Sequence, residues 1–363
     1  MSISIGAMTF VFKEIEQKDY EALSRGVGVP LTQNAFYGEW QVVLGKRVWR
    51  YSVGEGGIIF GFFQVIKYLL PIGNSYLYVP HGPIFIEEVS DELLAALRRF
   101  FCELLTRERS VFLRFDPTWK LSFQVVDKKL FERYFFKAAS FSYNGNFQPK
   151  YEWVIDLFRD EGEILASMKK VNRYSIGHAE RYGFTTMVLD KNFLEYLDKF
   201  YELIKVTAKR DKFLHHSKEY YGRIFKECEE AQNGFLVIVS FAGEVVLINF
   251  FVTYGDTAFF LFSGSRNEYR RSGYTYLAQW VAIKHSKKLG LRYYNFGAGI
   301  PENNKYFFYK SWQGFSDFKK RFGGSLVEYS DFYDVVYDKF WYVLYVYDLR
   351  KAFVLFWKRL FSI

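Results

Sequence analysis

Asp116 is a carboxylate that could handle a proton. It ends the apolar segment 110–117 (SVFLRFDP), which has the composition of a strand, so it stands where a strand gives way to a loop. A carboxylate at that place could accept or orient the proton of an attacking amine. An aspartate directly before a proline is equally a common turn opener. The sequence leaves both interpretations of Asp116 open.

A basic segment at residues 167–181 has the spacing of a helix. Its charged and titratable side chains are Lys169, Lys170, Arg173, His178 and Arg181. Such side chains can contact the phosphate groups of a nucleic acid. They equally suit an ordinary solvated helix face, and both interpretations stay open.

The cysteines and histidines do not form a metal-binding pattern. Cys102 and Cys228 are far apart and lack CxxC spacing, which fits a reducing compartment. His215 and His216 are adjacent, so they would face different sides of a strand or a helix. The isolated histidines are interpreted as structural: His81 and His285. We therefore expect no disulfide framework, no metal and no cofactor.

One loop has a spacing typical of coenzyme binding. Residues 270–275 (RRSGYT) nearly match Arg-x-x-Gly-x-Gly/Ala, a pattern in which backbone amides hold the pyrophosphate of an acyl-coenzyme A. Thr275 occupies the last position, where the pattern requires a small residue. An acyl-coenzyme A-dependent N-acyltransferase is therefore one function to be tested.

The elements that would carry these residues follow the same order in both halves of the chain. In the first half, β-rich segments at 56–70 and 75–85 precede a helical pattern at 91–106 and the strand that ends at Asp116. In the second half, a hairpin turning at Gly255-Asp256 precedes a helix at 275–289 and a strand that ends in the loop 296–298. An internal duplication explains this order, and chance similarity of two α/β patterns is the competing explanation. Further helices are expected at 17–23 and 192–207.

Composition and charge restrict the class of protein. The 363 residues suit two medium domains, and a hydrophobic content of 50% excludes global disorder. The formal net charge of +9 favours nucleic acid, an anionic membrane or a phosphorylated ligand, although an ordinary basic surface fits it as well. Residues 1–12 lack the pattern of a signal peptide, and no apolar run reaches membrane-spanning length. We therefore expect a cytoplasmic protein.

The C-terminal segment 340–363 combines an apolar stripe with basic residues. The stripe has helical spacing and consists of Leu349, Phe353, Phe356 and Leu360. Lys351 and Lys358 lie together on another side of the same helix. This pattern predicts an interfacial amphipathic helix, and a C-terminal helix docked on its own protein fits it equally well.

Six segments, in order along the chain, resemble motifs of the Fem-type (FemABX) aminoacyltransferases. The first five are 78–83 (YVPHGP), 114–117 (RFDP), Gln148-Pro149, 172–183 (NRYSIGHAERYG) and 207–213 (TAKRDKF) followed by Tyr220-Tyr221. The sixth is a pair, 294–300 (YNFGAGI) and 314–324 (GFSDFKKRFGG). The pair is similar to the family's aromatic-Asp-Phe-Gly-Gly-Ile and Gly-x-x-x-Phe-Lys-x-x-Phe-Gly-Gly.

The resemblance implies a fold and a domain division. The expected fold is α/β (α+β), with two tandem acetyltransferase-like (GNAT-like) domains and no long coiled-coil arm. The first domain would comprise residues 1–149, completed by residues 331–363. The second would comprise residues 150–330.

The resemblance also implies a reaction and the residues that serve it. The reaction is transfer of an amino acid from aminoacyl-tRNA onto the stem-peptide amine of a peptidoglycan precursor. An activated ester needs no metal and no covalent nucleophile; it needs orientation, amine deprotonation and oxyanion stabilisation. The implied catalytic residues are Lys319, as a cation facing the acceptor site, and Asp116; a solvated surface lysine is the alternative for Lys319. The implied substrate-binding residues are Phe318, Lys46, Arg50, Arg114, Arg173, Arg210, His216, Tyr254 and Gly297.

Departures from the family pattern bear on the acceptor. Trp40 is followed by Gln41, where some members carry a lysine that meets a nucleotide-sugar diphosphate. His216 stands where some have arginine, and Phe260 and Phe262 stand near positions that hold tyrosines. These differences disfavour UDP-MurNAc-pentapeptide and leave a lipid II-like precursor open, which the amphipathic C-terminal segment would suit. A monomer is expected, and a peripheral place on the inner face of the plasma membrane is compatible with this acceptor. A non-catalytic basic protein that binds a membrane surface or nucleic acid is a second alternative.

Overall fold

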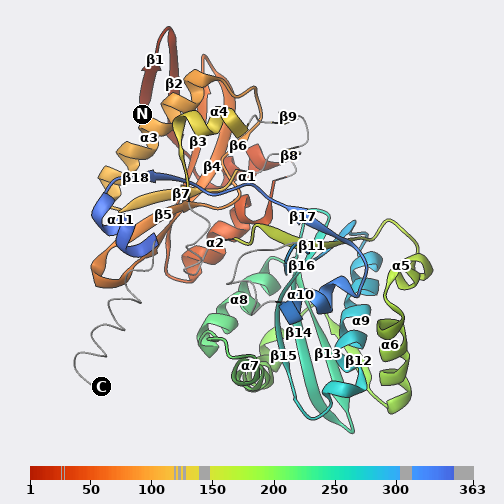
Figure 1. Ribbon diagram of the computed structural model, residues 1–363. Helices are drawn as coiled ribbons and strands as arrows, with labels where there is room; N and C mark the ends of the chain where they lie inside the picture. Colours follow the sequence, from red (N-terminus) through yellow and green to blue (C-terminus); the bar gives the residue numbers. More distant parts are fainter. Residues whose placement is uncertain are drawn as a thin grey trace. The chain divides into compact units, whose positions relative to one another are not determined.

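The computed structural model describes residues 1–25, 27, 29–117, 120–121, 124–125, 128–138, 148–302 and 313–346 (Figure 1). The chain divides into two units, each with its own core. Unit 1 comprises Met1–Gln148 together with Tyr329–Ile363, and unit 2 comprises Pro149–Glu328.

Unit 1 is built on a nine-stranded sheet. Its strands in spatial order are β1 (Ser2–Ile5), β2 (Met8–Glu14), β3 (Arg47–Glu55), β4 (Ile58–Leu69), β5 (Ser75–Val79), β7 (Phe112–Phe115), β18 (Tyr333–Val336) and β10 (Phe136–Lys137), with β6 (Ile84–Phe85) paired to β4. A separate pair consists of β8 (Lys120–Leu121) and β9 (Gln124–Val125). Neighbouring strands are antiparallel except β5 and β7, which are parallel.

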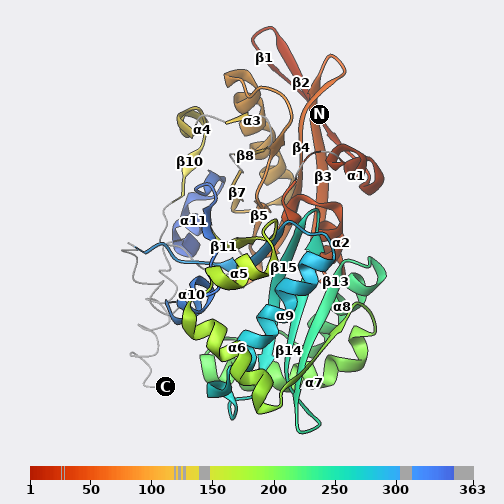
Figure 2. The same ribbon diagram turned by 90° about the vertical axis from the view of Figure 1, so that its right-hand side faces the viewer.

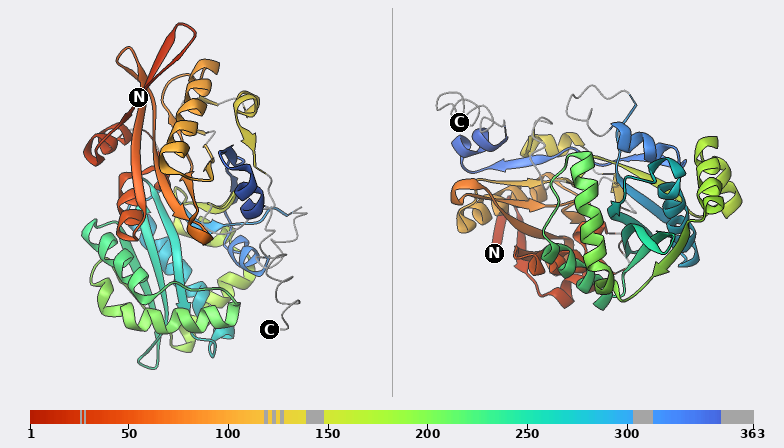
Figure 3. Two further views of the ribbon diagram at one scale, coloured as in Figure 1. Left: turned by 90° about the vertical axis from the view of Figure 1, so that its left-hand side faces the viewer. Right: turned by 90° about the horizontal axis from the view of Figure 1, so that it is seen from below.

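Helices cover both faces of this sheet (Figures 1 and 3). Helix α3 (Asp91–Glu108) packs on one face, and α1 (Gln17–Ser24) and α2 (Ala35–Val43) pack on the other. Helix α3 begins where a serine hydroxyl caps it, since Ser90 Oγ accepts the N–H of Leu93 at 3.1 Å. The other helical segments of unit 1 are α4 (Lys128–Tyr134), α11 (Lys339–Val346), η1 (Leu31–Gln33) and η2 (Pro71–Gly73).

Unit 2 is built on a seven-stranded sheet. Its strands in spatial order are β12 (Thr185–Leu189), β13 (Gly234–Phe241), β14 (Glu244–Tyr254), β15 (Thr257–Ser265), β16 (Tyr293–Ala298), β11 (Tyr151–Asp156) and β17 (Ser325–Glu328). Strands β15 and β16 are the parallel pair, and the other neighbours are antiparallel.

The unit 2 sheet is also covered on both faces (Figure 2). Helix α9 (Tyr274–Lys288) packs on one face with α6 (Lys170–Tyr182) beside it, and α7 (Leu197–Asp211) lies on the other face next to α8 (Lys218–Glu230). The remaining helical segments are α5 (Glu161–Ser167), α10 (Gln313–Lys320), η3 (Phe193–Tyr196) and η4 (Arg270–Ser272). Because both faces are covered, strand β13 is apolar over most of its length rather than alternating.

The repeated order predicted from the sequence is present in both units. The hairpin β4–β5, helix α3 and strand β7 in unit 1 correspond to β14–β15, α9 and β16 in unit 2, and each helix connects two parallel strands. The mixed α/β class is therefore confirmed. The helix expected at 192–207 was placed too early, because a 3-10 turn precedes α7, which runs to Asp211.

In the part of the chain that the structure describes, no helix combines the length and the apolarity that crossing a membrane requires. Helix α11 ends at Val346. The apolar stripe from Leu349 to Leu360 lies outside the described residues, so its interpretation stays a prediction.

Candidate functional site

The parallel strands of unit 2 separate part-way along their length. Strand β16 pairs with β15 from Tyr293 to Asn295, opposite Thr257 to Phe259. Beyond that point β15 stays paired with β14, and β16 stays paired with β11. Phe296, Gly297 and Ala298 therefore have no partner on β15 in the described register. Unpaired carbonyls at such a place need another donor.

Lys319 supplies a donor at this separation. Its Nζ lies 2.6 Å from the carbonyl oxygen of Ala298, and 3.7 Å from the ring centroid of Phe315 on the same helix. The residue is only 1% exposed, so the alternative of a solvated surface lysine is wrong. Burial lowers the pKa of Lys319 well below its ordinary value, and the negative charge of Glu152 opposes that shift.

Two polar residues fix the backbone that Lys319 contacts. Asn295 Nδ2 donates to Glu152 Oε2 at 2.6 Å, and Asn295 Oδ1 accepts the N–H of Gly297 at 2.7 Å. Gly297 has φ +71°, a conformation that favours glycine. Glu152 lies opposite Ala298 in the β11–β16 register. The buried carboxylate therefore holds the strand end that presents the Ala298 carbonyl.

Helix α10 and the segment after it are both tied to the same end of the sheet. Trp153 Nε1 donates to the carbonyl oxygen of Gly323 at 2.6 Å, and Ser316 Oγ accepts the N–H of Ile300 at 3.1 Å. A Cβ at Gly324 would lie 2.4 Å from the carbonyl oxygen of Val154, so only glycine fits there. The motif GFSDFKKRFGG therefore encodes a helix that carries Lys319 and a turn that anchors it.

Phe318 is adjacent to Lys319 but packs into the unit 2 core. Its ring centroid lies 5.0 Å from that of Tyr276 and 5.2 Å from that of Phe322. The side chain is half-buried. A Cβ at Gly297 would lie 4.0 Å from Lys319 Nζ, so the structure brings Lys319 and Gly297 together. The contacts of Phe318 lie in the core instead, and its substrate-binding role stays a prediction.

Asp116 lies in unit 1, at the end of the corresponding parallel pair. It is 2% exposed, Oδ1 accepts the backbone N–H of His81 at 2.9 Å, and a further hydrogen bond joins it to the side chain of Tyr78. Burial raises the pKa of the Asp116 carboxyl well above its ordinary value. These contacts hold the turn at His81, and the role of Asp116 as a base stays a prediction.

His81 is buried against Asp116 without forming a close ion pair. Its Nε2 lies 3.7 Å from Asp116 Oδ2, and its Nδ1 lies 3.0 Å from Thr32 Oγ1. Burial lowers the pKa of His81 to about 3. The imidazole is therefore neutral at ordinary pH, which fits the structural role expected for it.

Arg114 is committed to a buried ion pair. Its Nε and Nη2 each lie 2.7 Å from a carboxylate oxygen of Asp334, which faces it across the β7–β18 register. The hydroxyl of Tyr342 donates to the same carboxylate at 2.6 Å. Arg114 thereby ties the C-terminal strand to the sheet of unit 1.

Lys46 and Arg50 both contact residues of helix α2. Arg50 Nη2 lies 2.6 Å from Glu39 Oε1, which neutralises its charge. Lys46 Nζ donates to Gln41 Oε1 at 2.5 Å and lies 4.5 Å from the ring centroid of Tyr68. Burial lowers the pKa of Lys46 to about 8.

Arg173 and Arg210 each hold a loop of unit 2. Arg173 Nη1 donates to the carbonyl oxygens of Ala166, at 3.1 Å, and of Met168, and so satisfies the C-terminal end of α5. Arg210 pairs with Asp211 and donates to Asn267 Oδ1 at 2.9 Å.

His216 and Tyr254 lie elsewhere in unit 2. His216 lies in the loop between α7 and α8, so the expectation of a strand or helix there is wrong, and its ring stacks on Tyr220 at 3.8 Å. Tyr254 lies at the hairpin turn of β14–β15, where it pairs with Thr257. Thr257 is the first residue of β15 that pairs with β16, so Tyr254 lies at the opposite end of this pairing from Phe296. The contacts given above join Arg173, Arg210 and His216 to residues other than Lys319.

The comparisons with known proteins decide the family. The model of the FemAB family matches residues 51–243 and 241–347. The chain belongs to the FemAB family. This confirms the resemblance drawn from the six motifs.

Relatives and solved structures agree with FemAB membership. Lipid II:glycine glycyltransferase of Staphylococcus aureus (strain MRSA252) is 26% identical over 219 residues, which are 58% of this chain and 50% of the relative. The chain thus spans about half the length of the curated relatives it matches. The crystal structure of FemX is similar with a TM-score of 0.74 at 19% identity, covering 92% of this chain and 99% of FemX. A tandem GNAT protein from the clavulanic acid pathway has a TM-score of 0.57 at 12% identity, covering 90% and 98%. These two structures confirm the tandem GNAT-like fold.

The coenzyme-like loop of this FemAB-family chain is covered by helix α6. A Cβ at Gly273 would lie 2.2 Å from the carbonyl oxygen of Ser175, and His178 Nδ1 lies 2.9 Å from the carbonyl oxygen of Ser272. Helix α6 therefore occupies space directly beside this loop. That packing disfavours the acyl-coenzyme A interpretation.

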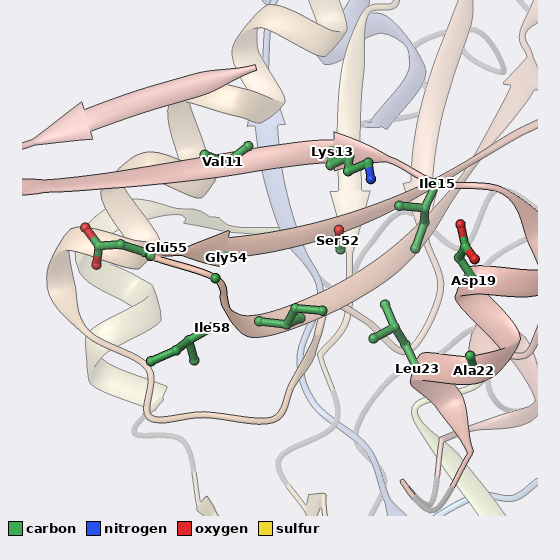
Figure 4. Close-up of a pocket in the computed structure, with 13 residues that line it drawn as sticks. Val11, Lys13, Ile15, Asp19, Ala22, Leu23, Ser52, Gly54, Glu55 and Ile58 are labelled. Atoms are coloured by element: carbon green, nitrogen blue, oxygen red, sulfur yellow. The ribbon is translucent and has the colours of Figure 1, made fainter.

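A surface hollow of about 500 Å³ lies in unit 1 (Figure 4). Its walls come from β2, α1, β3 and β4 and from the residues next to them, and its lining includes Val11, Ile15, Leu23, Ser52 and Ile58. Lys13, Asp19 and Glu55 are its charged residues. It contains none of the residues predicted for the site, so shape alone does not locate the chemistry.

Sequence reasoning missed Glu152 and Phe315. A glutamate inside the apolar segment YEWVIDL was a usable signal, because a buried charge in a strand needs a partner. Its partner Asn295 is distant in sequence, and only the β11–β16 register brings them together. Phe315 lies within the quoted motif, yet its ring position under Lys319 depends on where α10 packs.

Proposed function

We propose that this protein transfers an amino acid from aminoacyl-tRNA to the stem-peptide amine of a lipid-linked peptidoglycan precursor. FemAB membership supports this, and so does the similarity to a relative that is a lipid II:glycine glycyltransferase. The observation that carries the proposal is the buried Lys319 at the separation of β15 and β16. The donor is cytoplasmic, so we place the reaction at the inner membrane face and propose a monomeric enzyme.

The proposed reaction is an aminolysis. The precursor amine attacks the carbonyl carbon of the aminoacyl ester and a C–N bond forms. The ester C–O bond then breaks, the amine loses a proton, and the tRNA hydroxyl leaves with a proton. The enzyme must orient the amine and stabilise the negative charge that develops on the carbonyl oxygen.

Lys319 is the group that we assign to the developing oxyanion. Its Nζ already donates to one carbonyl, that of Ala298, so it is oriented toward oxygen acceptors. An ammonium in a site that excludes water stabilises negative charge more than one in bulk solvent. Glu152 supports the charged form, since its carboxylate opposes the lowering of the Lys319 pKa by burial.

Asp116 remains our candidate for orienting the amine or accepting its proton. Burial raises the pKa of its carboxyl well above the ordinary value. Its contacts with His81 and Tyr78 also serve the turn that follows β5. Replacing Asp116 by asparagine keeps a hydrogen-bond acceptor for that turn and removes the base.

The choice of a lipid-linked acceptor rests on the lipid II substrate of the relative and on the cations near Trp40. Gln41 stands at the position after Trp40, and Arg50 is already paired with Glu39. Compared with family members that carry a lysine after this Trp, the chain therefore has fewer cations that could bind a nucleotide diphosphate. The membrane role of the segment from Leu349 onward stays a prediction.

The acceptor is tested by incubating the protein and charged tRNAs with equal concentrations of lipid II and UDP-MurNAc-pentapeptide. Mass spectrometry should find the added amino acid on lipid II first. Preferential modification of the nucleotide precursor would contradict the lipid-linked acceptor. Calorimetric binding of acetyl-coenzyme A, followed by acylation of an amine, would instead support the N-acyltransferase.

A further inference from the structure

Helix α6 carries a row of aromatic side chains on its outer face. Tyr174, His178 and Tyr182 follow one another at intervals of four residues, and both successive ring centroids are 5.8 Å apart. The planes are inclined by only 30° and 28°. Tyr174 is 63% exposed and Tyr182 is 52% exposed. Residues four apart are neighbours on a helix surface, so these rings form one ridge.

The ridge is held by the body of unit 2. His178 Nδ1 lies 2.9 Å from the carbonyl oxygen of Ser272, and because a carbonyl only accepts, Nδ1 carries the proton. The ring of Tyr182 stacks on that of Phe241 at 5.3 Å. Ile176 and Ala179, on the opposite face of α6, are buried in the core. The rings are therefore positioned before any ligand binds, which reduces the cost of ordering them.

Cations flank the aromatic ridge. Lys170 precedes Tyr174 by four residues and extends the same row, while Arg181 lies in the adjacent row. Gly177 makes room for Arg181, since a Cβ at that position would lie 3.2 Å from Arg181 Nη1. Glu180 is the one acidic residue within α6. The outer face of α6 is therefore both aromatic and positively charged.

This combination matches the chemistry of a single-stranded nucleic acid. Bases stack on aromatic rings whatever their sequence, and phosphates pair with nearby cations. From Tyr174 to Tyr182 the helix rises about 12 Å. That length corresponds to about three or four nucleotides, at roughly 3.4 Å per phosphate of one strand.

We propose that the aromatic ridge of α6, formed by Tyr174, His178 and Tyr182, binds the single-stranded 3′ end of the donor tRNA together with the flanking cations Lys170 and Arg181. The inference rests on the proposed function, which makes aminoacyl-tRNA the donor. An anionic membrane would attract the same cations. However, the one exposed aliphatic side chain of α6 is Val171, whereas an interfacial helix inserts a broad apolar stripe.

The test measures binding without turnover. Fluorescence anisotropy compares two uncharged RNA hairpins with the same stem, one blunt and one with a short single-stranded 3′ extension. Wild-type protein should prefer the extended hairpin by about tenfold or more, since each stacked base contributes measurably. The double variant Tyr174→Ala/Tyr182→Ala should lose the preference, whereas Tyr174→Phe/Tyr182→Phe should keep it. Phe158→Ala, which removes an 85% exposed ring elsewhere in unit 2, is the matched control and should change nothing.

Two results would overturn the proposal. One is an equal preference in wild type and in the double alanine variant, with circular dichroism showing both folded. The other is loss of binding to phosphatidylglycerol vesicles in the alanine variant while hairpin binding is unchanged, which would assign the ridge to a membrane. A ridge-dependent preference in a protein that transfers no amino acid would support the binding site and contradict only the proposed function.

Discussion

At the scale of single residues, Lys319 combines burial with a charge that burial disfavours. Its side chain donates to a backbone carbonyl at the separation of two strands, with an aromatic ring beneath it. Groups with strongly shifted pKa values and specific charge partners cluster at functional sites. A lysine kept there for stability alone is a poor choice, because a long apolar side chain would avoid the desolvation cost.

Replacing Lys319 by methionine should therefore not lower the free energy of unfolding by more than about 1 kcal/mol, which is the scale of the lost hydrogen bond to Ala298. The pKa of Lys319 is lower in the folded than in the unfolded chain, so the folded state binds fewer protons. Burying the charged amine therefore lowers the free energy of unfolding. This loss of stability is complete below the lowered pKa and disappears as pH rises toward 10.5. Over that pH window, the free energy of unfolding measured with urea should rise in the wild type relative to the Lys319→Met variant. Lys320→Met is the control, and a strongly destabilised Lys319→Met protein would make Lys319 a structural residue.

Glu152 should set the pH range in which Lys319 works. Its charge raises the Lys319 pKa against burial, so Glu152→Gln should lower that pKa further. If the ammonium form is the active one, kcat falls as pH rises through this pKa. The alkaline limb of the pH–rate profile should then move to lower pH in Glu152→Gln. Glu328→Gln on the neighbouring strand β17 removes an exposed carboxylate and should leave the limb in place; a limb that stays in place in Glu152→Gln as well would contradict this role.

At the scale of elements, local patterns predicted helices and strands well because each pattern lies within one segment. The apolar stripe of 91–106 predicted α3, and the glycine-aspartate pair predicted the hairpin turn of β14–β15. The partner of Glu152 could not be predicted, because Asn295 reaches it only through the pairing of β11 with β16. The burial of Lys319 likewise depends on where α10 packs, since its motif contains three consecutive basic residues that resemble a solvated surface.

Helix α6 should contribute a salt-dependent part of the tRNA affinity. Its cations displace counterions from phosphates, so log affinity should fall linearly with log salt. Neutralising Lys169, Lys170 and Arg181 to glutamine should reduce the slope by roughly two to three. Arg173 is left intact because it also satisfies the end of α5. Filter binding of tRNA between low and moderate salt measures the slope, and an unchanged slope in the triple variant would contradict the assignment.

At the scale of the whole molecule, strand β18 comes late in the sequence but lies inside the sheet of unit 1, between β7 and β10. Arg114 and Asp334 lock this pairing in the interior of unit 1. Asp334→Asn should cost about 3–5 kcal/mol in urea unfolding, because it leaves a buried guanidinium without its counter-charge. Removing Lys137, which pairs with Asp331 near the surface, should cost under about 1 kcal/mol. Equal costs for the two variants would mean that the buried pair does not hold unit 1 together.

The central claim is that the protein transfers an aminoacyl group from tRNA to a lipid-linked precursor, and that Lys319 stabilises the oxyanion that develops in this reaction. The most direct measurement is mass spectrometry of lipid II incubated with charged tRNAs and either wild-type or Lys319→Ala protein. We predict a product heavier by an aminoacyl residue, formed at a rate about a hundredfold or more lower in the variant. No mass increase with any charged tRNA would contradict the proposed function. Equal rates for the two folded proteins would contradict the role of Lys319.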